Sequence, residues 1–392
     1  IARVRSRIPT NHNPFYYFDR AIISIDTLKQ DAEYRTYLEK CYWDIIVIDE
    51  AHNVAARGND AASLSMRYRL ANLLKHRSDT LIMLSATPHD GKPRAFASLM
   101  NMLNPTAIAN QEDYGPDDIK GLFIRRFKKD IKDQVAKSFM ERKISVAKCQ
   151  ASVQEEAAFD VFTRMNFTRL DQRRTAGKLF KTTLEKSLFS SPAACLQTIQ
   201  HRISRLQKEE SEDAAKDIQS LEELADNLQP IASNNFSKYQ KLLSVIRDSL
   251  HGFGWTGKDT SDRLVIFTER IETLKFLSDH LPKDLGLKED RFAILHGGLP
   301  DVDQQKIVED FGREEAPVRL LLASDVASEG INLHFLCHKM IHFDIPWSFM
   351  CFQQRNGRID RYGQEREPRI VYLMTESDSE KIKGDNRILE LL

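Results

Sequence analysis

Unbroken apolar runs alternate along this chain with segments whose apolar residues recur at helical spacing. The clearest run, residues 45–48, is β-branched and has no polar alternation, which is typical of a parallel strand buried on both faces. Shorter or less purely apolar runs that also predict strands occur at residues 21–25, 80–84, 264–267, 292–295, 318–323 and 339–343. Helical spacing occurs at residues 28–40, 65–76, 238–250, 273–281 and 302–311. This alternation predicts βαβ units and parallel sheets.

The pattern changes between residues 150 and 229, where apolar residues keep helical spacing and no strand-like run occurs. This stretch therefore predicts a helical block. The α/β pattern resumes at about residue 238. We predict an α/β fold with two doubly wound parallel-sheet lobes and an intervening helical block, divided as residues 1–149, 150–235 and 236–392.

The composition is that of a globular protein with more than one domain. The chain has 392 residues, 41% of them hydrophobic and 29% charged. Lys+Arg and Asp+Glu both number 57, so a nucleic-acid site would have to be a local basic patch. The five cysteines form no Cys-x-x-Cys pair, which argues against a disulfide framework or a zinc ribbon and fits a reducing, intracellular setting. No apolar run approaches membrane-spanning length, so we expect no membrane partner.

Polar residues follow two of the predicted strands directly. Asp49 and Glu50 follow the run at 45–48, at the strand end where ligands bind in open α/β sheets. Adjacent acids in such a place can hold a hydrated Mg²⁺ and orient a water against a phosphate. A solvated strand end is the alternative interpretation. The run at 318–323 is followed by a hydroxyl, an acid and a glycine that suit phosphate and ribose contacts, namely Ser324, Asp325 and Gly330.

Three arginines recur at intervals of three residues, at Arg355, Arg358 and Arg361. On a helix they would form a slowly rotating stripe that can point at one anionic target. The planar, permanently charged guanidinium group matches phosphate oxygens. A surface stripe paired with Asp360 and Glu365 is the alternative.

Together with their neighbours, these residues resemble the Swi/Snf-type ATPases of helicase superfamily two, and within them the bacterial RapA-like branch. Asp49-Glu50-Ala51-His52 matches the DEAH box of the family, and Ser85-Ala86-Thr87-Pro88 matches its third motif. Further segments look like later motifs in the correct order, at residues 122–130, 264–268, 295–298, 324–333 and 354–364. The resemblance spans about residues 20–370 and implies two RecA-like lobes.

The resemblance implies ATP and Mg²⁺ as cofactors. Asp49 would coordinate Mg²⁺ through water, and Glu50 would orient or deprotonate the attacking water. Arg358 and Arg361 would act as arginine fingers from the opposite lobe, so that hydrolysis requires closure. The remaining catalytic and nucleotide-binding roles would fall on Gln354, Asp325 and Gly330.

The resemblance also implies residues that couple the nucleotide site to nucleic acid. These would be Ser85, Thr87 and His52. Contacts to the DNA backbone would come from Ser24, Thr27, Thr268 and Ser324. Such sequence-independent contacts suit a motor that moves over any sequence. The helical block would carry partner or DNA contacts.

One departure from the family is its phosphate loop, Gly-x-x-x-x-Gly-Lys followed by Ser or Thr, which is not found in the 48 residues before Asp49. Residues 252–258 contain the glycines and the lysine, but they follow a predicted helix, precede a strand and continue with Asp259. We interpret them as a chance match. We therefore expect the chain to be part of a longer protein with the loop upstream, and to hydrolyse ATP poorly alone.

The histidines His334, His338 and His342 have a spacing that would suit zinc on a helix. However, His342 belongs to the predicted strand at 339–343, so the three cannot share a helical face. Packing or polar roles are therefore the favoured interpretation.

The leading hypothesis is an ATP-dependent translocase on double-stranded DNA, in the bacterial cytoplasm and associated with the nucleoid. Protein partners could bind the helical block or domains outside this chain. Transcription recycling and phage defence are both compatible with the residues. A strand-separating DNA or RNA helicase is the closest alternative. A non-hydrolysing scaffold is the alternative of another class, and the presence of Asp49, Glu50, Arg358 and Arg361 argues against it.

Overall fold

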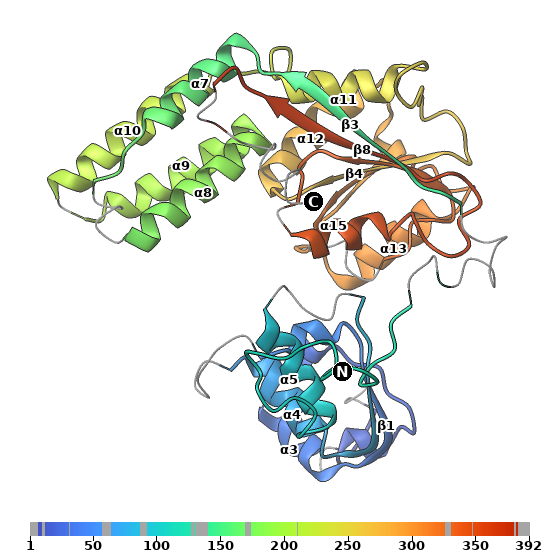
Figure 1. Ribbon diagram of the computed structural model, residues 1–392. Coiled ribbons are helices and arrows are strands. Elements are labelled where there is room, and N and C mark those ends of the chain that lie inside the picture. Colours follow the sequence, from blue (N-terminus) through green and yellow to red (C-terminus); the bar gives the residue numbers. More distant parts are fainter. Residues whose placement is uncertain are drawn as a thin grey trace. The chain divides into compact units, whose positions relative to one another are not determined.

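The computed structural model describes residues 7–9, 12–30, 32–56, 64–86, 92–126, 130, 140–168, 174–209, 211–325, 331–346, 348–379 and 382. The chain forms two compact units, Ile1–Asp130 and Ile131–Leu392, and each is considered by itself (Figure 1). The elements of the first unit are η1 (Pro14–Tyr16), α2 (Ile25–Gln30), α3 (Ala32–Lys40), β1 (Trp43–Ile48), η2 (Ala51–Val54), α4 (Met66–Leu74), β2 (Ser78–Met83) and α5 (Pro93–Leu103).

The first unit contains a parallel pair of strands, β1 and β2, covered by helices on one face. Ile46 and Ile48 point into the core formed with α4 and α5. On the other face Ile45 is 57% exposed and Val47 is 53% exposed. The prediction of a strand buried on both faces is therefore wrong for the described residues, because helices α2–α5 pack against only one side of this two-stranded sheet.

The predicted strand at residues 21–25 is also wrong. Residues 21–24 have no regular structure and α2 begins at Ile25. The Ser24 hydroxyl accepts a hydrogen bond from the Asp26 N–H (3.3 Å), and the Ser24 carbonyl accepts one from the Thr27 N–H (3.1 Å). A serine that caps a helix in this way outweighs a short β-branched run. Helices α2 and α3 take the place of the single helix predicted at 28–40, whereas α4 and β2 confirm the predictions at 65–76 and 80–84.

The second unit contains a larger sheet and two groups of helices. Its elements are β3 (Lys143–Gln150), α7 (Val153–Arg164), α8 (Arg174–Ser190), α9 (Pro192–Leu206), α10 (Glu212–Leu228), α11 (Ser237–Arg247), β4 (Arg263–Thr268), α12 (Ile271–Asp284), η4 (Glu289–Arg291), β5 (Phe292–Leu295), α13 (Asp301–Phe311), β6 (Leu320–Ser324), β7 (Cys337–His342), α15 (Phe349–Asn356) and β8 (Arg369–Glu376). In the described parts of both units, no helix is long and apolar enough to cross a membrane.

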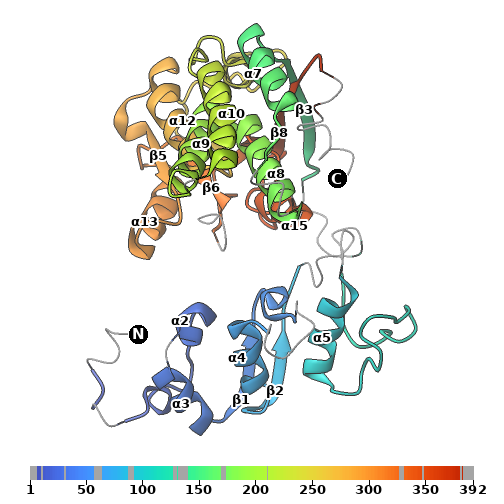
Figure 2. The same cartoon turned by 90° about the vertical axis from the view of Figure 1, so that its left-hand side faces the viewer.

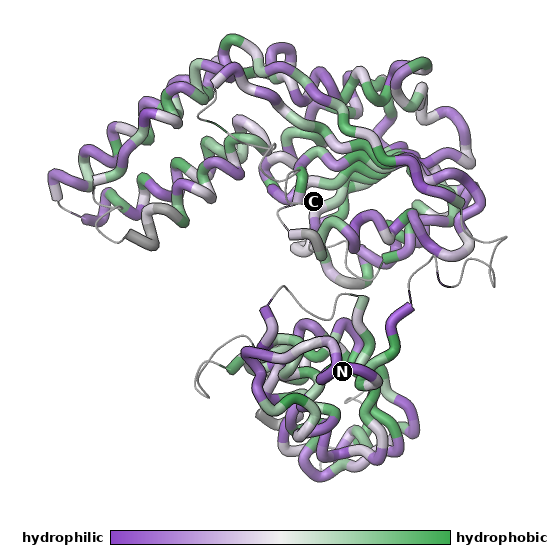
Figure 3. The backbone as a smooth tube through the Cα atoms, viewed as in Figure 1, coloured by the Kyte–Doolittle hydropathy of each residue, from purple (hydrophilic) through white to green (hydrophobic). Residues whose placement is uncertain are grey.

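All six strands of this sheet are parallel, in the order β3-β8-β7-β4-β6-β5. The central strands β4 and β6 are buried along their whole length, and Figure 3 shows hydrophobic residues gathered along them. Helices α11 and α12 pack on one face, whereas α13 and α15 pack on the other. The α/β class with a doubly wound parallel sheet is confirmed, as are the strands predicted between residues 264 and 343.

Strands β3 and β8 are the part of this sheet that was not predicted above. β3 pairs with β8 from Lys143↔Arg369 to Gln150↔Glu376. The predicted boundary at 149 placed this segment in the first lobe, which is wrong, because its pairing partner lies near the other end of the chain. β8 does carry a local strand signal, the unbroken apolar run at residues 370–374, whereas its pairing with β3 cannot be read from either segment.

Helices α7–α10 form the helical block predicted at 150–229 and lie side by side (Figure 2). A sharp connection joins α8 and α9, where Ser191 caps α9 and Pro192 occupies its first turn. Buried residues of the block and of α11, α12 and the sheet belong to one continuous core. The block is therefore an extension of the second unit with no core of its own.

Candidate functional site

The acidic pair of the first unit lies in a turn at the end of β1. Glu50 has φ 48° and ψ 47° and is the one residue other than glycine with positive φ in the described part of the chain. The Asp49 carboxylate accepts the Glu50 N–H at 2.8 Å. The Ala51 N–H donates to the Leu84 carbonyl (2.8 Å), and the Leu84 N–H donates to the Ile48 carbonyl (2.9 Å). Left-handed backbone at a residue with a side chain is unfavourable by about 1–2 kcal/mol and persists where its surroundings enforce it, often at functional sites.

His52 brings the ends of β1 and β2 together. Its ring is buried, and Nδ1 lies 3.4 Å from Glu50 Oε2 and 3.1 Å from Ser85 Oγ. Ser85 follows β2 as Glu50 follows β1, so the two parallel strands deliver both side chains to the same sheet edge. Three of the predicted site residues, Glu50, His52 and Ser85, are thus in contact through one imidazole. Thr87 lies outside the described residues.

Asp49 is exposed and offers a carboxylate to solvent. The described residues contain no group of three His, Cys, Asp or Glu side chains placed to hold a metal ion together. A single exposed carboxylate fits Mg²⁺, which keeps several waters and is usually held by one or two carboxylates together with substrate phosphates.

Ser24 and Thr27, predicted to contact nucleic acid, are both exposed at the start of α2. The helix is fixed to α4 by a two-bonded ion pair between Asp26 and Arg67, with both nitrogen–oxygen distances at 2.6 Å. The two hydroxyl groups therefore stand on an anchored helix start where solvent reaches them.

The arginines of the second unit do not share a helical face. Helix α15 ends at Asn356, followed by Gly357, so Arg358 and Arg361 lie in the turn beyond it. Arg355 is fully buried, pairs with Asp325, and donates to the Asp344 carbonyl at 2.9 Å. The predicted stripe is therefore wrong, because Arg355 is buried on the last turn of α15 and the other two arginines lie beyond the end of the helix.

The turn that carries Arg358 and Arg361 is bonded to the segment at residues 331–333. Arg358 is 8% exposed and donates from Nη1 to the Ile331 carbonyl (3.2 Å), and the Leu333 N–H donates to the Arg358 carbonyl (3.1 Å). Arg361 is exposed and donates to the Asn332 side chain. Asp360, proposed in the alternative interpretation as a partner of the stripe, pairs with Arg142 at 3.2 Å.

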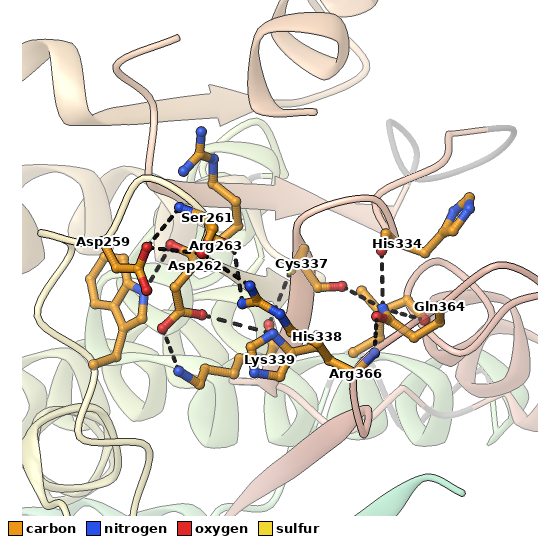
Figure 4. Close-up of polar contacts among 12 residues, drawn as sticks. Asp259, Ser261, Asp262, Arg263, His334, Cys337, His338, Lys339, Gln364 and Arg366 are labelled. Atoms are coloured by element: carbon orange, nitrogen blue, oxygen red, sulfur yellow. Dashed lines mark hydrogen bonds and ion pairs between the residues drawn. The ribbon is translucent and has the colours of Figure 1, made fainter. Parts of the chain in front are cut away.

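Gln364 closes this turn and was given no role by the sequence analysis, although it ends the sixth motif. Its buried Nε2 donates to the carbonyls of His334 (3.1 Å), Cys337 (2.9 Å) and Ile359 (3.1 Å), while Oε1 accepts the Arg366 N–H at 3.0 Å (Figure 4). A side-chain amide can donate and accept at the same time, so Gln364 provides partners both for backbone carbonyls and for a backbone N–H of this loop. The sequence signal that could have indicated a role for Gln364 is its position directly after Gly363, at the end of that motif.

The three histidines occupy different environments. His342 lies in β7, as predicted, and its Nε2 is 2.9 Å from Asn356 Oδ1. Burial lowers the pKa of His338 to about 4, against the opposing effect of Asp262. Burial, with the Arg361 charge as a smaller cause, lowers the pKa of His334. Burial, with the Arg355 charge as a smaller cause, lowers the pKa of His342 too, so all three groups favour the neutral form.

Two family models match the chain. The SNF2-related domain matches residues 7–201, and the helicase conserved C-terminal domain matches residues 237–363. The chain belongs to the Swi/Snf-type ATPases of helicase superfamily two and is RapA-like.

Curated relatives of this Swi/Snf-type chain include two bacterial proteins. An uncharacterized ATP-dependent helicase of Bacillus subtilis, YqhH, is 26% identical over 388 residues, which are 95% of this chain and 62% of the relative. The RNA polymerase-associated protein RapA of Vibrio campbellii is 24% identical over 91% of this chain and 38% of its own length. The chain thus spans less than two thirds of each relative.

Solved structures similar to the Swi/Snf-type chain include the Pyrococcus furiosus Hef helicase domain, with TM-score 0.47, 14% identity, and coverage of 94% of this chain and 77% of that one. A second is the Sulfolobus solfataricus SWI2/SNF2 ATPase core in complex with double-stranded DNA, with TM-score 0.41 and 19% identity, covering 90% of this chain and 67% of that one.

Several residues that the Swi/Snf resemblance assigned to ligands are occupied within the protein. Thr268 and Ser324 are neighbours at the ends of β4 and β6, and both are buried. The Thr268 hydroxyl donates to the Asp344 carboxylate. Asp325 is engaged by Arg355. Contact of Thr268 and Ser324 with DNA stays a prediction, and in this structure both side chains are buried at the ends of their strands.

Gln354 and Gly330 are the remaining positions that were predicted to bind nucleotide or act in catalysis. Gln354 lies half-buried on α15, and Gly330 is outside the part of the chain that the structure describes. The chance match at residues 252–258 is an irregular loop after α11 and before β4, as predicted, with Phe253 and Trp255 buried in the core.

Proposed function

We propose that the protein containing this chain is an ATP-dependent translocase that moves along double-stranded DNA, acting in the bacterial nucleoid. Family membership supports the class of motor. The observation that carries the proposal is the contact of Glu50, whose backbone is left-handed, with buried His52 and, through it, with Ser85. An ordinary solvated strand end has no need of this arrangement.

ATP hydrolysis would use acidic residues to handle the water and the metal ion, and arginines to stabilise the charge on the phosphoryl group. Glu50 is the group to orient or deprotonate a water, since its carboxylate is held at the strand end and solvent reaches it. Asp49 would hold Mg²⁺, and ATP bound with this ion would supply the phosphoryl group for the water that Glu50 orients. Arg358 and Arg361 carry permanent charge, and arginines of this kind raise phosphoryl-transfer rates by roughly 10³–10⁵.

Movement on DNA requires that the nucleotide site act on the nucleic-acid contacts. His52 contacts both Glu50 and Ser85. A change in charge near Glu50 can therefore shift the His52 ring and, through it, the position of Ser85 at the end of β2. The exposed hydroxyl groups of Ser24 and Thr27 are suited to bonds with backbone phosphates, which carry no sequence information.

The test is ATP hydrolysis by the full-length protein with Glu50→Gln. We expect turnover to fall by roughly 10²-fold or more, because the variant keeps the shape of the side chain and loses its basicity. Asp44→Asn is the matched control, since Asp44 is exposed on the same strand and should be dispensable. Parent-like turnover by Glu50→Gln would refute the motor assignment.

Stimulation by nucleic acid tests the partner. Double-stranded DNA should raise hydrolysis more than RNA does, and the reverse preference would indicate an RNA helicase. We expect weak turnover from the 392-residue chain itself, because its sequence contains no phosphate loop with a hydroxyl after the lysine.

A further inference from the structure

A buried polar cluster lies where the helical block meets the carboxyl ends of β4 and β7. The cluster consists of Ser190, Ser191, Thr268, Thr273, Asp344 and Arg355, none more than 6% exposed. Groups of this kind are unfavourable in a protein interior unless they are hydrogen-bonded to one another. The cluster plays no part in the chemistry described above, and the sequence did not single out Asp344.

Asp344 is the centre of the cluster. Its Oδ2 accepts hydrogen bonds from the Ser190 hydroxyl (2.9 Å), the Glu269 N–H (2.9 Å) and the Thr268 hydroxyl. A carboxylate can only accept, so the Ser190 hydroxyl must donate to it. Ser190 is the last residue of α8, and this bond ties the helical block to the sheet edge.

Thr273 supports Ser190 from α12. Its hydroxyl oxygen lies 2.6 Å from that of Ser190 and 2.7 Å from that of Ser191. Because the Ser190 proton is directed at Asp344, Thr273 donates to Ser190 and accepts from Ser191. The connection between α8 and α9 is therefore held by a directed chain of hydroxyl groups that ends on Asp344.

The backbone carbonyl of Asp344 links the cluster to the turn at residues 357–361 that carries Arg358 and Arg361, which we call the arginine turn. This carbonyl accepts from Nη1 of Arg355 at 2.9 Å, and the Arg355 carbonyl accepts the N–H of Arg358 at 3.0 Å. Arg355 also pairs with Asp325 and lies 3.2 Å from His342 Nδ1, which fixes its guanidinium group across the ends of β6 and β7. Three hydrogen bonds in series thus join the end of α8 to the backbone of Arg358.

Stability alone does not account for this cluster. Asp344 Oδ1, Arg355 Nη2 and Ser324 Oγ are buried and have no hydrogen-bond partner among the described residues. Apolar side chains of similar volume would stabilise such a region at least as well as charges that are incompletely bonded. A polar network is retained where it fixes one specific arrangement of the parts that it joins.

We propose that Asp344 is a positioning residue that couples the helical block to the arginine turn, so that attachment of α8 sets the placement of Arg358. The inference rests on the proposed function, because it takes Arg358 to act in phosphoryl transfer. It makes the helical block a regulatory element: whatever binds the block and shifts the end of α8 changes hydrolysis without touching nucleotide.

The test compares two substitutions in the full-length protein. Ser190→Ala removes the bond to Asp344. Gln197→Ala is the matched control, since Gln197 on α9 donates to Glu272 at 3.0 Å and also links the block to α12 without reaching Asp344. Glu272 keeps Lys275 as a partner at 2.9 Å in that control.

Hydrogen exchange of the amides at residues 355–364 is the first readout, because it does not depend on activity. We expect Ser190→Ala to speed exchange there by about 3- to 10-fold and Gln197→Ala to leave it unchanged. ATP hydrolysis is the second readout. Ser190→Ala should lower kcat by about 3- to 10-fold with KM for ATP unchanged, which is the sign of an interaction lost only in the transition state.

Arg358→Ala distinguishes the catalytic role proposed for Arg358 from the coupling proposed for Asp344. In that background Ser190→Ala should have no further effect on kcat, since the coupling has lost its target. If Ser190→Ala and Gln197→Ala behave alike in exchange and in kcat, Asp344 is an anchor only and the inference is overturned. If Arg358→Ala leaves kcat unchanged, the catalytic role of Arg358 fails, while the exchange comparison still decides whether the junction exists.

Discussion

The acidic turn at residues 49–52 and the segment at residues 355–361, which runs from the end of α15 into the turn that carries Arg358 and Arg361, are held in place in different ways. Asp49 is exposed, Glu50 is partly buried, and their contacts come from β1, β2 and the next few residues. Arg355 is fully buried and is bonded to residues that follow β6 and β7. One turn depends on local backbone geometry and the other on a network of distant partners. Substitutions should therefore change stability little in the first and greatly in the second.

The largest expected effect comes from Arg355→Met. The change removes the guanidinium group from Asp325, which is 25% exposed, and from the Asp344 carbonyl. Removal of one member of a buried ion pair is unfavourable by about 3–5 kcal/mol, and the partial exposure of Asp325 places the expected loss toward the lower end of that range. Arg67→Met is the matched control, because Arg67 pairs with Asp26 in the first unit with both side chains at least one-third exposed. That control should lose about 1 kcal/mol or less. Chemical denaturation monitored for each variant checks the difference, and equal losses would contradict the comparison.

Gln364→Ala should have the next largest effect. It leaves the carbonyls of His334, Cys337 and Ile359 without this donor, and a buried group that loses its partner is unfavourable by about 1–3 kcal/mol. Gln353→Ala serves as control, since Gln353 is exposed on α15 and should change stability by about 0.5 kcal/mol at most. Thermal unfolding measures both, and a control as damaging as Gln364→Ala would show that the helix matters more than the amide.

This contrast also explains what could be predicted from the sequence. The strands β4–β7 and the acidic pair follow from apolar runs and from what comes directly after them, which are local signals. The placement of Arg355, Thr268 and β3 depends on partners far away in the chain, namely Asp325, Asp344 and β8. A period of three residues indicated a helical stripe, but it did not show that α15 ends at Asn356. Motif order supplied the candidate site residues, but it did not show which of these polar residues face inward.

A smaller effect is expected from pH. Burial lowers the pKa of His338 from 6.5 to about 4. The folded state therefore favours neutral His338, so its contribution to stability is complete above pH 6.5 and is lost as pH falls toward 4. His338→Asn should flatten the dependence of stability on pH in that window. Denaturation midpoints across this range check it, and an unchanged slope in His338→Asn would contradict it.

The smallest effect tests the acidic turn itself, through Glu50→Gly. Glycine adopts φ 48° without steric strain, so the folded state gains while the unfolded chain becomes more flexible, for a net stabilisation of roughly 0.5–1 kcal/mol. Asp44→Gly, on the extended and exposed part of β1, lacks the first effect and should lose a similar amount. Opposite signs for a substitution in the turn and one in the strand before it would show that the left-handed backbone at Glu50 is strained. Equal losses measured by denaturation would show instead that the turn is relaxed, and would remove the structural basis for placing a catalytic carboxylate there.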